Sequence, residues 1–139
     1  MKSLVWFRND LRIYDNPALK AACQNASNVS AVFIFSQKQL EEHNESNVKI
    51  DFLIKNLFHL SKKLNKLNIP LTIISSSGFI EDPKHIEKLC KDRKINKVFF
   101  NSQFGIDEES RDTNVKNTLE RNNIKWESFQ DQVIYEPGS

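Results

Sequence analysis

Polar side chains gather in two segments that directly follow apolar, strand-like runs. Arg8-Asn9-Asp10-Leu11-Arg12 follows the run 3–7, and Asn101-Ser102-Gln103-Phe104-Gly105 closes the run 97–101. Their guanidinium, carboxylate and amide groups donate and accept hydrogen bonds but form no nucleophile–base pair. We therefore expect these segments to bind a ligand of open identity, through Arg8, Asp10, Arg12, Asn101 and Gln103.

A structural role is the alternative for the same kinds of residue. Charges beside a buried strand end must be paired, which would make an ion-paired turn of Arg8, Asp10, Arg12 and Asp15. A structural role is also the alternative at the start of the predicted helix that follows the run 97–101. Acids there complement the helix dipole, and charged residues in such a place commonly form a solvated face. The residues concerned there are Glu108, Glu109, Arg111 and Asp112.

The phosphate-binding loops of common nucleotide folds are missing from this sequence. The chain has three glycines, Gly78, Gly105 and Gly138, and none forms GxGxxG or GxxxxGK[ST]. Arg8 and Asn9 stand where a dinucleotide fold needs glycine for the pyrophosphate to approach closely. The sequence therefore argues against classical NAD binding and P-loop phosphate transfer.

Histidine and cysteine form no catalytic or metal-binding set. Cys23 and Cys90 fall on apolar positions of predicted helices, which indicates small buried hydrophobic residues in a reducing compartment. His43 lies in a polar stretch, and His59 and His85 have no partner at catalytic spacing. We predict no metal site and no Ser-His-Asp or Cys-His arrangement.

Apolar runs and helical segments alternate along the chain. The predicted strands are 3–7, 29–35, 71–75, 97–101 and 124–129, and they are nearly continuously apolar, which suits strands covered on both faces. This alternation predicts an α/β fold with a five-stranded parallel sheet and helices on both faces. The preferred strand order is 3-2-1-4-5, and the flavodoxin-like order 2-1-3-4-5 is second. In the preferred order, ligands bind between strands 1 and 4, where the winding reverses.

Capping residues and apolar periodicity delimit four helices. Asn16 and Pro17 start the first helix, which runs to about residue 26, and Asp82-Pro83 gives the same signal for the third. The second spans about 47–67 and ends before Asn68, a residue suited to a left-handed C-cap. Its predicted inward residues are Ile50, Leu53, Ile54, Leu57, Leu60, Leu64 and Leu67. The third carries Ile86, Leu89 and Cys90 inward, and the fourth, about 107–122, is anchored by Val115 and Leu119.

Length and composition suit one ordinary globular domain. The chain has 139 residues, of which 39% are hydrophobic and 27% charged. A net charge of only +2, with acids and bases interleaved, gives no case for nucleic-acid binding by this chain. No signal peptide or membrane-spanning run is visible, so we expect a cytoplasmic, monomeric protein.

Near its start the chain reads Trp6-Phe7-Arg8-Asn9-Asp10-Leu11-Arg12, followed by Asp15-Asn16-Pro17-Ala18-Leu19. This stretch resembles the opening WFRxDLRxxDNxAL motif of the DNA photolyase and cryptochrome family. The resemblance continues in order along the whole chain. Further matching positions are Phe52-Leu53, Ile69-Pro70-Leu71, Val98 to Asn101, Ser110-Arg111-Asp112 with Val115, and Asp131, Val133, Pro137 and Gly138.

The resemblance implies that residues 1–139 are the N-terminal α/β domain of a longer, two-domain protein. In such proteins this domain helps to hold an antenna pigment, and a helical C-terminal domain binds FAD and damaged DNA. The implied activity is light-driven repair of cyclobutane pyrimidine dimers by a deoxyribodipyrimidine photo-lyase that uses reduced FAD. Catalytic residues are then expected outside this chain.

The resemblance also implies an antenna site. Relatives that use a methenyltetrahydrofolate antenna contact it through a histidine after strand 2 and an Asn-Glu pair after strand 4, which match His43 and Asp107-Glu108 here. Asp107 replaces the usual asparagine, Lys49 stands where many relatives carry arginine, and Gly105 where some carry glutamate. Other members hold a flavin or deazaflavin deeper in the strand-end crevice, near residues 8–12 and 101–104.

Two other functions remain open. Cryptochromes share this domain but signal instead of repairing DNA, and the residues that separate the two lie outside the chain. A stand-alone adenine-nucleotide-binding α/β module is less favoured, because it expects a late glycine-rich phosphate loop.

Overall fold

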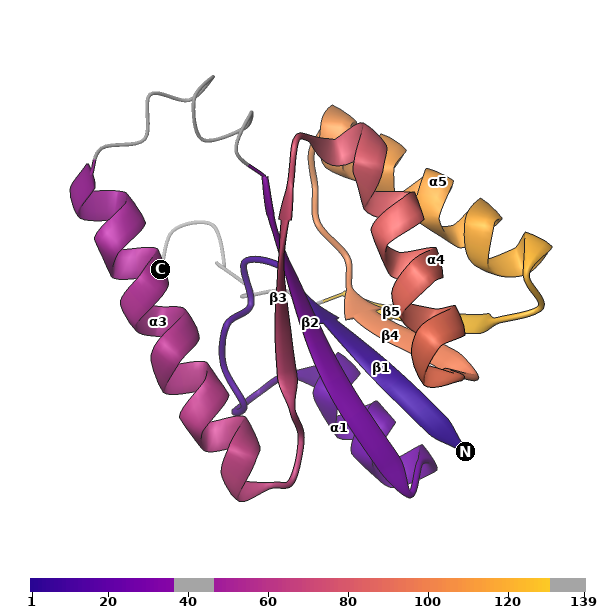
Figure 1. Cartoon of the computed structure of the whole chain (residues 1–139), viewed down its shortest axis with the longest axis horizontal. Coiled ribbons are helices and arrows are strands. Elements are labelled where there is room, and N and C mark those ends of the chain that lie inside the picture. Colours follow the sequence, from indigo (N-terminus) through magenta and orange to yellow (C-terminus); the bar gives the residue numbers. More distant parts are fainter. Residues whose placement is uncertain (37–46, 131–139) are drawn as a thin grey trace, which may run out of the picture.

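The structure, a computed structural model, describes residues 1–36 and 47–130. Strands and helices alternate along the chain (Figure 1). The strands are β1 (Lys2–Phe7), β2 (Asn28–Ser36), β3 (Leu71–Ser76), β4 (Lys97–Asn101) and β5 (Lys125–Phe129). The helices are α1 (Pro17–Asn25), α3 (Asn47–Lys66), the 3-10 helix η1 (Phe79–Glu81), α4 (Asp82–Arg93) and α5 (Ile106–Arg121).

The five strands form one parallel sheet in the order β3-β2-β1-β4-β5. The central strand β1 pairs with β2 on one side and β4 on the other, with Val5 opposite Ala31 and Phe99. The predicted order 3-2-1-4-5 is therefore confirmed, and the order 2-1-3-4-5 is wrong. The winding reverses between β1 and β4, so the segments that leave these strands, beginning at Arg8 and at Ser102, meet at one edge of the sheet.

Two apolar cores cover the two faces of the sheet. Alternate residues of β1 point to opposite faces, so Leu4 and Trp6 join the core under α4 and α5. Val5 and Phe7 join the core under α1 and α3. Figure 1 shows the same division, with α3 and α1 on one side of the sheet and α4 and α5 on the other.

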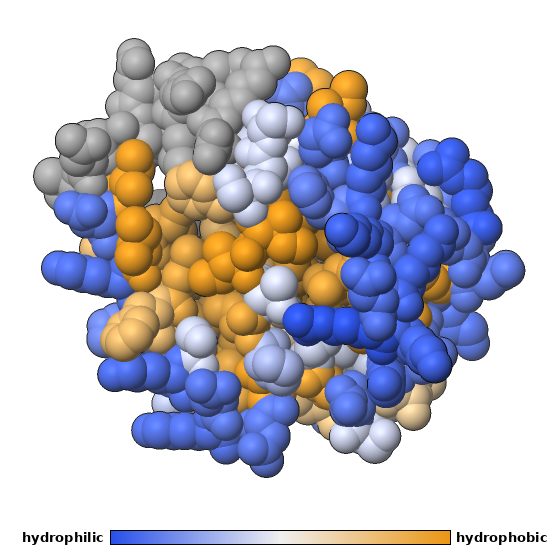
Figure 2. All heavy atoms as spheres, viewed as in Figure 1, coloured by the Kyte–Doolittle hydropathy of each residue, from blue (hydrophilic) through white to orange (hydrophobic). Residues whose placement is uncertain are grey.

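The edge strands are less covered than their apolar sequences predict. Every residue of β5 except the exposed Lys125 is half-buried, and Ile73 in β3 is 52% exposed. An edge strand has a neighbour on only one side, so full cover on both faces is wrong for β3 and β5. Figure 2 shows apolar side chains gathered over β3 and the facing side of α3, while hydrophilic side chains cover α4 and α5.

The predicted helix ends agree closely with the structure. The Asn16 side chain accepts a hydrogen bond from the Leu19 amide at 3.2 Å, and Pro17 is the first helical residue of α1. Asn68 is left-handed, with φ of 60°. The third helix differs in detail, because η1 precedes it. Glu81 is the N-cap residue of α4, and Asp82 lies inside the helix, buried.

Three residues that the sequence predicts to face inward are exposed. In α3, Leu57, Leu60 and Leu64 are buried, but Ile54 is exposed, because 3.6 residues per turn place it about 90° from the middle of the buried stripe. Leu67 lies beyond the last turn of α3 and is also exposed. Cys90 is buried as expected, whereas Cys23 in α1 is exposed.

Truncating Leu64 should test this revised helix face. Leu64 is 0% exposed and Leu67 is 51% exposed. Leu64→Ala removes buried methyl groups and leaves a cavity, so we expect a loss of about 2–5 kcal/mol in the free energy of unfolding. Leu67→Ala, as the control, should change it by no more than about 0.5 kcal/mol in urea denaturation. Equal losses in the two variants would contradict the assigned face.

Candidate functional site

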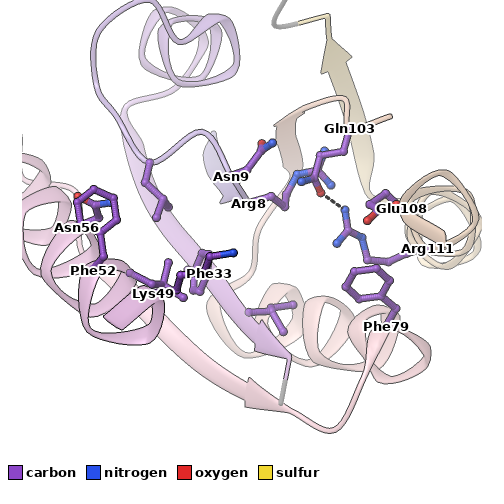
Figure 3. A pocket seen from close by; sticks show the side chains of 13 residues that line it. Arg8, Asn9, Phe33, Lys49, Phe52, Asn56, Phe79, Gln103, Glu108 and Arg111 are labelled. Carbon is purple, nitrogen blue, oxygen red and sulfur yellow. Dashed lines mark hydrogen bonds between the residues drawn. The ribbon is translucent and has the colours of Figure 1, made fainter. Parts of the chain in front are cut away.

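A pocket of about 430 Å³ opens at the carboxyl edge of the sheet, beside the reversal between β1 and β4. Figure 3 shows two facing walls, with Lys49, Phe52 and Asn56 of α3 across from Arg8, Gln103 and Arg111. The remaining lining residues are Asn9, Leu11, Phe33, Ile34, Leu53, Phe79 and Glu108. Its volume falls in the usual range for small-molecule sites, and its lining joins aromatic rings to a few polar groups.

The Arg8 guanidinium is buried at the inner end of this pocket. Its Nη1 lies 2.7 Å from Asp112 Oδ1, and its Nη2 donates to the main-chain carbonyl of Asn101. The guanidinium carbon lies 4.5 Å from the ring centroid of Trp6 and 4.9 Å from that of Phe100. Burial lowers the pKa of Arg8, and the charge of Asp112 opposes that change. The side chain stays a cation that is held in one place by charge pairing and ring contacts.

Arg111 shares the same carboxylate with Arg8. Arg111 Nε lies 3.1 Å from Asp112 Oδ1, and Nη2 donates to Gln103 Oε1 (Figure 3). Its guanidinium carbon lies 4.5 Å from the ring centroid of Phe79 and 5.0 Å from that of Trp6. The Nη1 group of Arg111 has no hydrogen-bond acceptor among residues 1–36 and 47–130. One buried carboxylate thus balances two buried cations beside the pocket.

A second carboxyl group belongs to the same charged cluster. Asp82 is 2% exposed, and its Oδ1 has no hydrogen-bond partner in the described part of the chain. Burial raises the pKa of Asp82 to about 6, while the charge of Arg111 and a hydrogen bond from Ser76 oppose the rise. Asp82 therefore changes charge near neutral pH, next to a cation that lines the pocket.

Asp10 ties the end of β1 to α1 and β4 instead of facing the pocket. Its Oδ1 accepts the Arg8 main-chain N–H at 2.8 Å, and its Oδ2 accepts from Asn101 Nδ2 at 2.6 Å. Asn101 Nδ2 also donates to Asn16 Oδ1 at 2.8 Å, and Asn101 Oδ1 accepts the Ala18 amide at 3.1 Å. These buried hydrogen bonds give Asp10 and Asn101 a structural role.

The structure separates the predicted site residues into two groups. Arg8, Gln103 and Glu108 line the pocket together. Asp10 and Asn101 lie behind it, and Arg12 closes its own turn by donating to the Asp15 carbonyl at 2.9 Å. Asp107 is exposed in the first turn of α5 and does not line this pocket. His43 and the exit block 131–138 lie outside the described residues.

Gly105 allows Glu108 to fold back over the start of α5. Gly105 has φ of 135°, and a methyl group built on it would come within 2.1 Å of Glu108 Oε2. A side chain at this position is therefore strained by the backbone conformation, and it would also displace the Glu108 carboxylate.

Local interpretation of the sequence missed two of the most important groups. Arg111 and Asp112 were expected on a solvated helix face, and both are buried, because their partner Arg8 lies 104 positions from Asp112 in sequence. The resemblance did mark the Arg-Asp pair as a motif. Phe79 and Asn56 carried no recognisable signal, since their relation to the pocket depends on how η1 and α3 pack.

Within residues 1–36 and 47–130, no helix has the length and apolar character needed to cross a membrane. In the same residues, no three His, Cys, Asp or Glu side chains gather as metal ligands.

Asp10→Ala should destabilise the chain because it leaves the Arg8 amide and Asn101 Nδ2 without their acceptor. Each unsatisfied buried group costs about 1–3 kcal/mol, so for two such groups we expect a loss of roughly 2–6 kcal/mol in the free energy of unfolding. Asp51→Ala, on the exposed side of α3, is the control. Urea denaturation curves of Asp10→Ala that overlay the parent would rule out the structural role.

Asp82 should make stability depend on pH. With its pKa raised from 3.8 to about 6, the folded chain holds a proton that the unfolded chain has lost between these values. Stability from this group is thus complete below about pH 4, falls by about 3 kcal/mol as pH rises to 6, and is then constant. Asp82→Asn should be more stable than the parent at pH 7.5 by on the order of 1–3 kcal/mol, with the difference shrinking by pH 4.5. Urea denaturation at both pH values tests this, with the exposed Asp92→Asn as the control. A difference that does not change with pH would contradict the assignment.

Comparison with known proteins places this chain in a family. The DNA photolyase family model matches residues 3–139. A deoxyribodipyrimidine photo-lyase of Buchnera aphidicola subsp. Baizongia pistaciae is 40% identical over 99% of this chain, and that of Escherichia coli K12 is 35% identical over 98%. The chain spans 29% of the length of each. Cryptochrome-2 of Arabidopsis thaliana is 34% identical over 98% of this chain and 22% of its own length.

Solved structures agree with the sequence matches. An archaeal photolyase from Sulfolobus tokodaii has a TM-score of 0.81 and 26% identity, over 94% of this chain and 29% of that one. Its structure holds two FAD molecules and is described as implying a novel light-harvesting cofactor. A Synechocystis cryptochrome, at 20% identity and a TM-score of 0.83, shows the fold. With the family model matched at residues 3–139, the chain belongs to the DNA photolyase family.

Proposed function

We propose that this chain is the antenna-chromophore-binding domain of a light-driven deoxyribodipyrimidine photo-lyase, which repairs cyclobutane pyrimidine dimers in DNA with reduced FAD. The observation that carries the proposal is 35–40% identity to photo-lyases over nearly the whole chain. The fold supports it, since the pocket lies where the winding of the sheet reverses.

The remaining parts of the activity are assigned to a helical C-terminal domain of the longer protein. That domain is proposed to hold FAD and to bind damaged DNA, and to be the direct partner of this one. A net charge of +2 supports this division, because phosphate contacts need a dense basic surface. The protein is proposed to be a cytoplasmic monomer.

The pocket suits a flat heteroaromatic ring with an anionic tail. Phe33, Phe52 and Leu53 offer an apolar wall to the ring, and Arg8 and Arg111 offer two cations to the tail. A flavin nucleotide and a methenyltetrahydrofolate share this chemistry, whereas a deazaflavin without an anionic group would use the apolar wall alone. The two FAD molecules of the Sulfolobus photolyase support a flavin-class pigment in such a domain.

The folate proposal depends on the acids after β4. Glu108 lines the pocket, where its carboxylate can accept the N–H groups of a pterin edge. Asp107 is exposed, so its part in that recognition would have to involve the proposed second domain. His43 stays a prediction. Folate is therefore proposed on Glu108, with the pigment shared between the domains.

When bound, an antenna pigment absorbs light and passes the energy through space to the flavin. The residues of this chain bind and orient it. The paired guanidiniums of Arg8 and Arg111 are fixed by Asp112, so an anionic tail would meet donors that are already in position. A cryptochrome-type signalling protein is the second candidate, favoured by the 34% identity to Cryptochrome-2.

The longer protein that contains this chain provides the test. We expect light-dependent restoration of pyrimidines in dimer-containing oligonucleotides, and a pigment that extraction and mass spectrometry identify as folate or flavin. Glu108→Ala should reduce bound antenna by about tenfold, the factor for a loss of 1.4 kcal/mol, and slow repair in dim light. Repair under bright light should persist, because the flavin absorbs directly. The control is Glu109→Ala, which changes an exposed neighbouring acid.

Each outcome of this test has a distinct meaning. Absence of repair, with pigment and flavin bound, would favour the cryptochrome alternative. Full antenna absorption in Glu108→Ala would place the pigment away from Glu108 and remove the folate proposal.

A further inference from the structure

We propose that an anionic ligand enters the pocket together with a proton, which Asp82 takes up. The inference rests on the proposed function in one respect, namely that the pocket holds a ring with an anionic tail. Asp82 then acts as a charge-balancing residue that interacts with the charged cluster through space and does not contact the ligand.

The first support is the position of Asp82. It is buried, does not line the pocket, and its Oδ1 has no acceptor or donor partner in residues 1–36 and 47–130. The groups that act on it come from every element around it. They are Arg8 after β1, Ser76 at the end of β3, and Arg111 and Asp112 of α5. Glu81, its neighbour in η1, pairs with Lys84 at 4.0 Å.

The second support is a direct path from the pocket to Asp82. Arg111 lines the pocket and also belongs to the charged cluster around Asp82. Its guanidinium stacks on Phe79 at 4.5 Å, and Phe79 also lines the pocket. Phe79 starts η1, which leads directly into Asp82. A ligand on Arg111 therefore acts on the same cation that stabilises the Asp82 carboxylate.

The third support is the charge balance. Two guanidiniums act with three buried carboxyl groups, Asp112, Asp82 and Asp10, so the cluster has no spare positive charge when all three acids are ionised. An anionic tail adds one more negative charge in a buried place. Asp112 is held in hydrogen bonds to both arginines, whereas Asp82 has an unpartnered oxygen and a pKa already raised to about 6. Asp82 is thus the acid that loses its charge.

The consequence is a defined pH dependence. If ligand binding raises the pKa of Asp82, the ligand must bind more tightly as pH falls toward 6. For each unit by which the pKa rises, the protonated form of Asp82 binds the ligand about tenfold more tightly than the ionised form. With a rise of about 0.5–1 unit in this pKa from about 6, affinity for an anionic ligand should therefore decline by roughly two- to fivefold between pH 6 and pH 8. A neutral ligand with the same ring should show no such decline from this group.

Carboxyl-carbon NMR of the full 139-residue chain tests the coupling, since it detects weak binding. The probes are flavin mononucleotide and 5,10-methenyltetrahydrofolate at constant ionic strength, with riboflavin as the neutral control. Asp82→Asn assigns the Asp82 resonance. We expect saturation with either anionic probe to raise the titration midpoint of Asp82 by about 0.5–1 pH unit, and riboflavin to leave it unchanged.

A second measurement uses affinity. Asp82→Asn should bind flavin mononucleotide about three- to tenfold more tightly than the parent at pH 8, because the competing charge is gone. Asp92→Asn should bind as the parent does. Titration of the ligand phosphate is common to all variants and cancels in the comparison.

The possible failures are distinguishable. If pocket resonances move with an anionic probe while the Asp82 midpoint stays, the coupling is wrong and the proposed site stands. If no probe moves the pocket resonances at saturating millimolar concentration, both the site and the coupling are overturned. Should Asp82→Asn fail to fold, the comparison of flavin mononucleotide with riboflavin on the parent chain still decides.

Discussion

The carboxylate of Asp112 balances two buried guanidiniums that come from different parts of the chain. Arg8 enters from the end of β1 and Arg111 from one turn of α5, and both place their planes near the ring of Trp6. Removing this carboxylate would leave the two buried guanidiniums without their hydrogen-bonded anion, at a cost of several kcal/mol. The exit of β1, the start of α5 and the inner end of the pocket are therefore positioned by one interaction. The hydrogen-bond donors of the two arginines are thus held in fixed positions by the fold itself, without a ligand.

A separate set of neutral and acidic groups holds the frame around this ion cluster. Asp10, Asn16 and Asn101 join the ends of β1 and β4 to the first turn of α1 through buried hydrogen bonds. The two sets meet at Asn101, whose amide serves the frame and whose main-chain carbonyl accepts from Arg8. Polar residues at this edge thus divide into a supporting layer and a layer that lines the pocket. Because both layers have the same composition, their sequence alone could not separate them.

Features set by local or periodic rules were predictable. Parallel strands linked by helices limit the sheet to few orders, and Asn16-Pro17 and Asn68 act on their own backbone neighbours. The misplaced residues depend on distant ones. Cys23 and Ile54 lie beside the buried stripes of their helices, and only the packed sheet decides how wide each stripe is. Arg111 and Asp112 look like a solvated helix start unless Arg8 is brought beside them. The family motif includes both residues. A family motif can reflect contacts between residues far apart in sequence, whereas local helix propensity reflects only neighbouring residues.

In the proposed antenna role, the two walls of the pocket contribute differently. On the wall from α3, Phe52 and Leu53 offer apolar surface beside Lys49 and Asn56. That apolar surface accepts many flat rings because dispersion and burial are not directional. The wall from β1, β4 and α5 is built of fixed charges whose hydrogen bonds are directional. Energy transfer through space depends on the orientation of the pigment, so orientation must come from the charged wall, acting on the tail. A neutral pigment would be retained by the ring wall but held less firmly in direction. The charge state of the cluster, which includes Asp82, therefore affects how firmly this domain binds and orients a ligand.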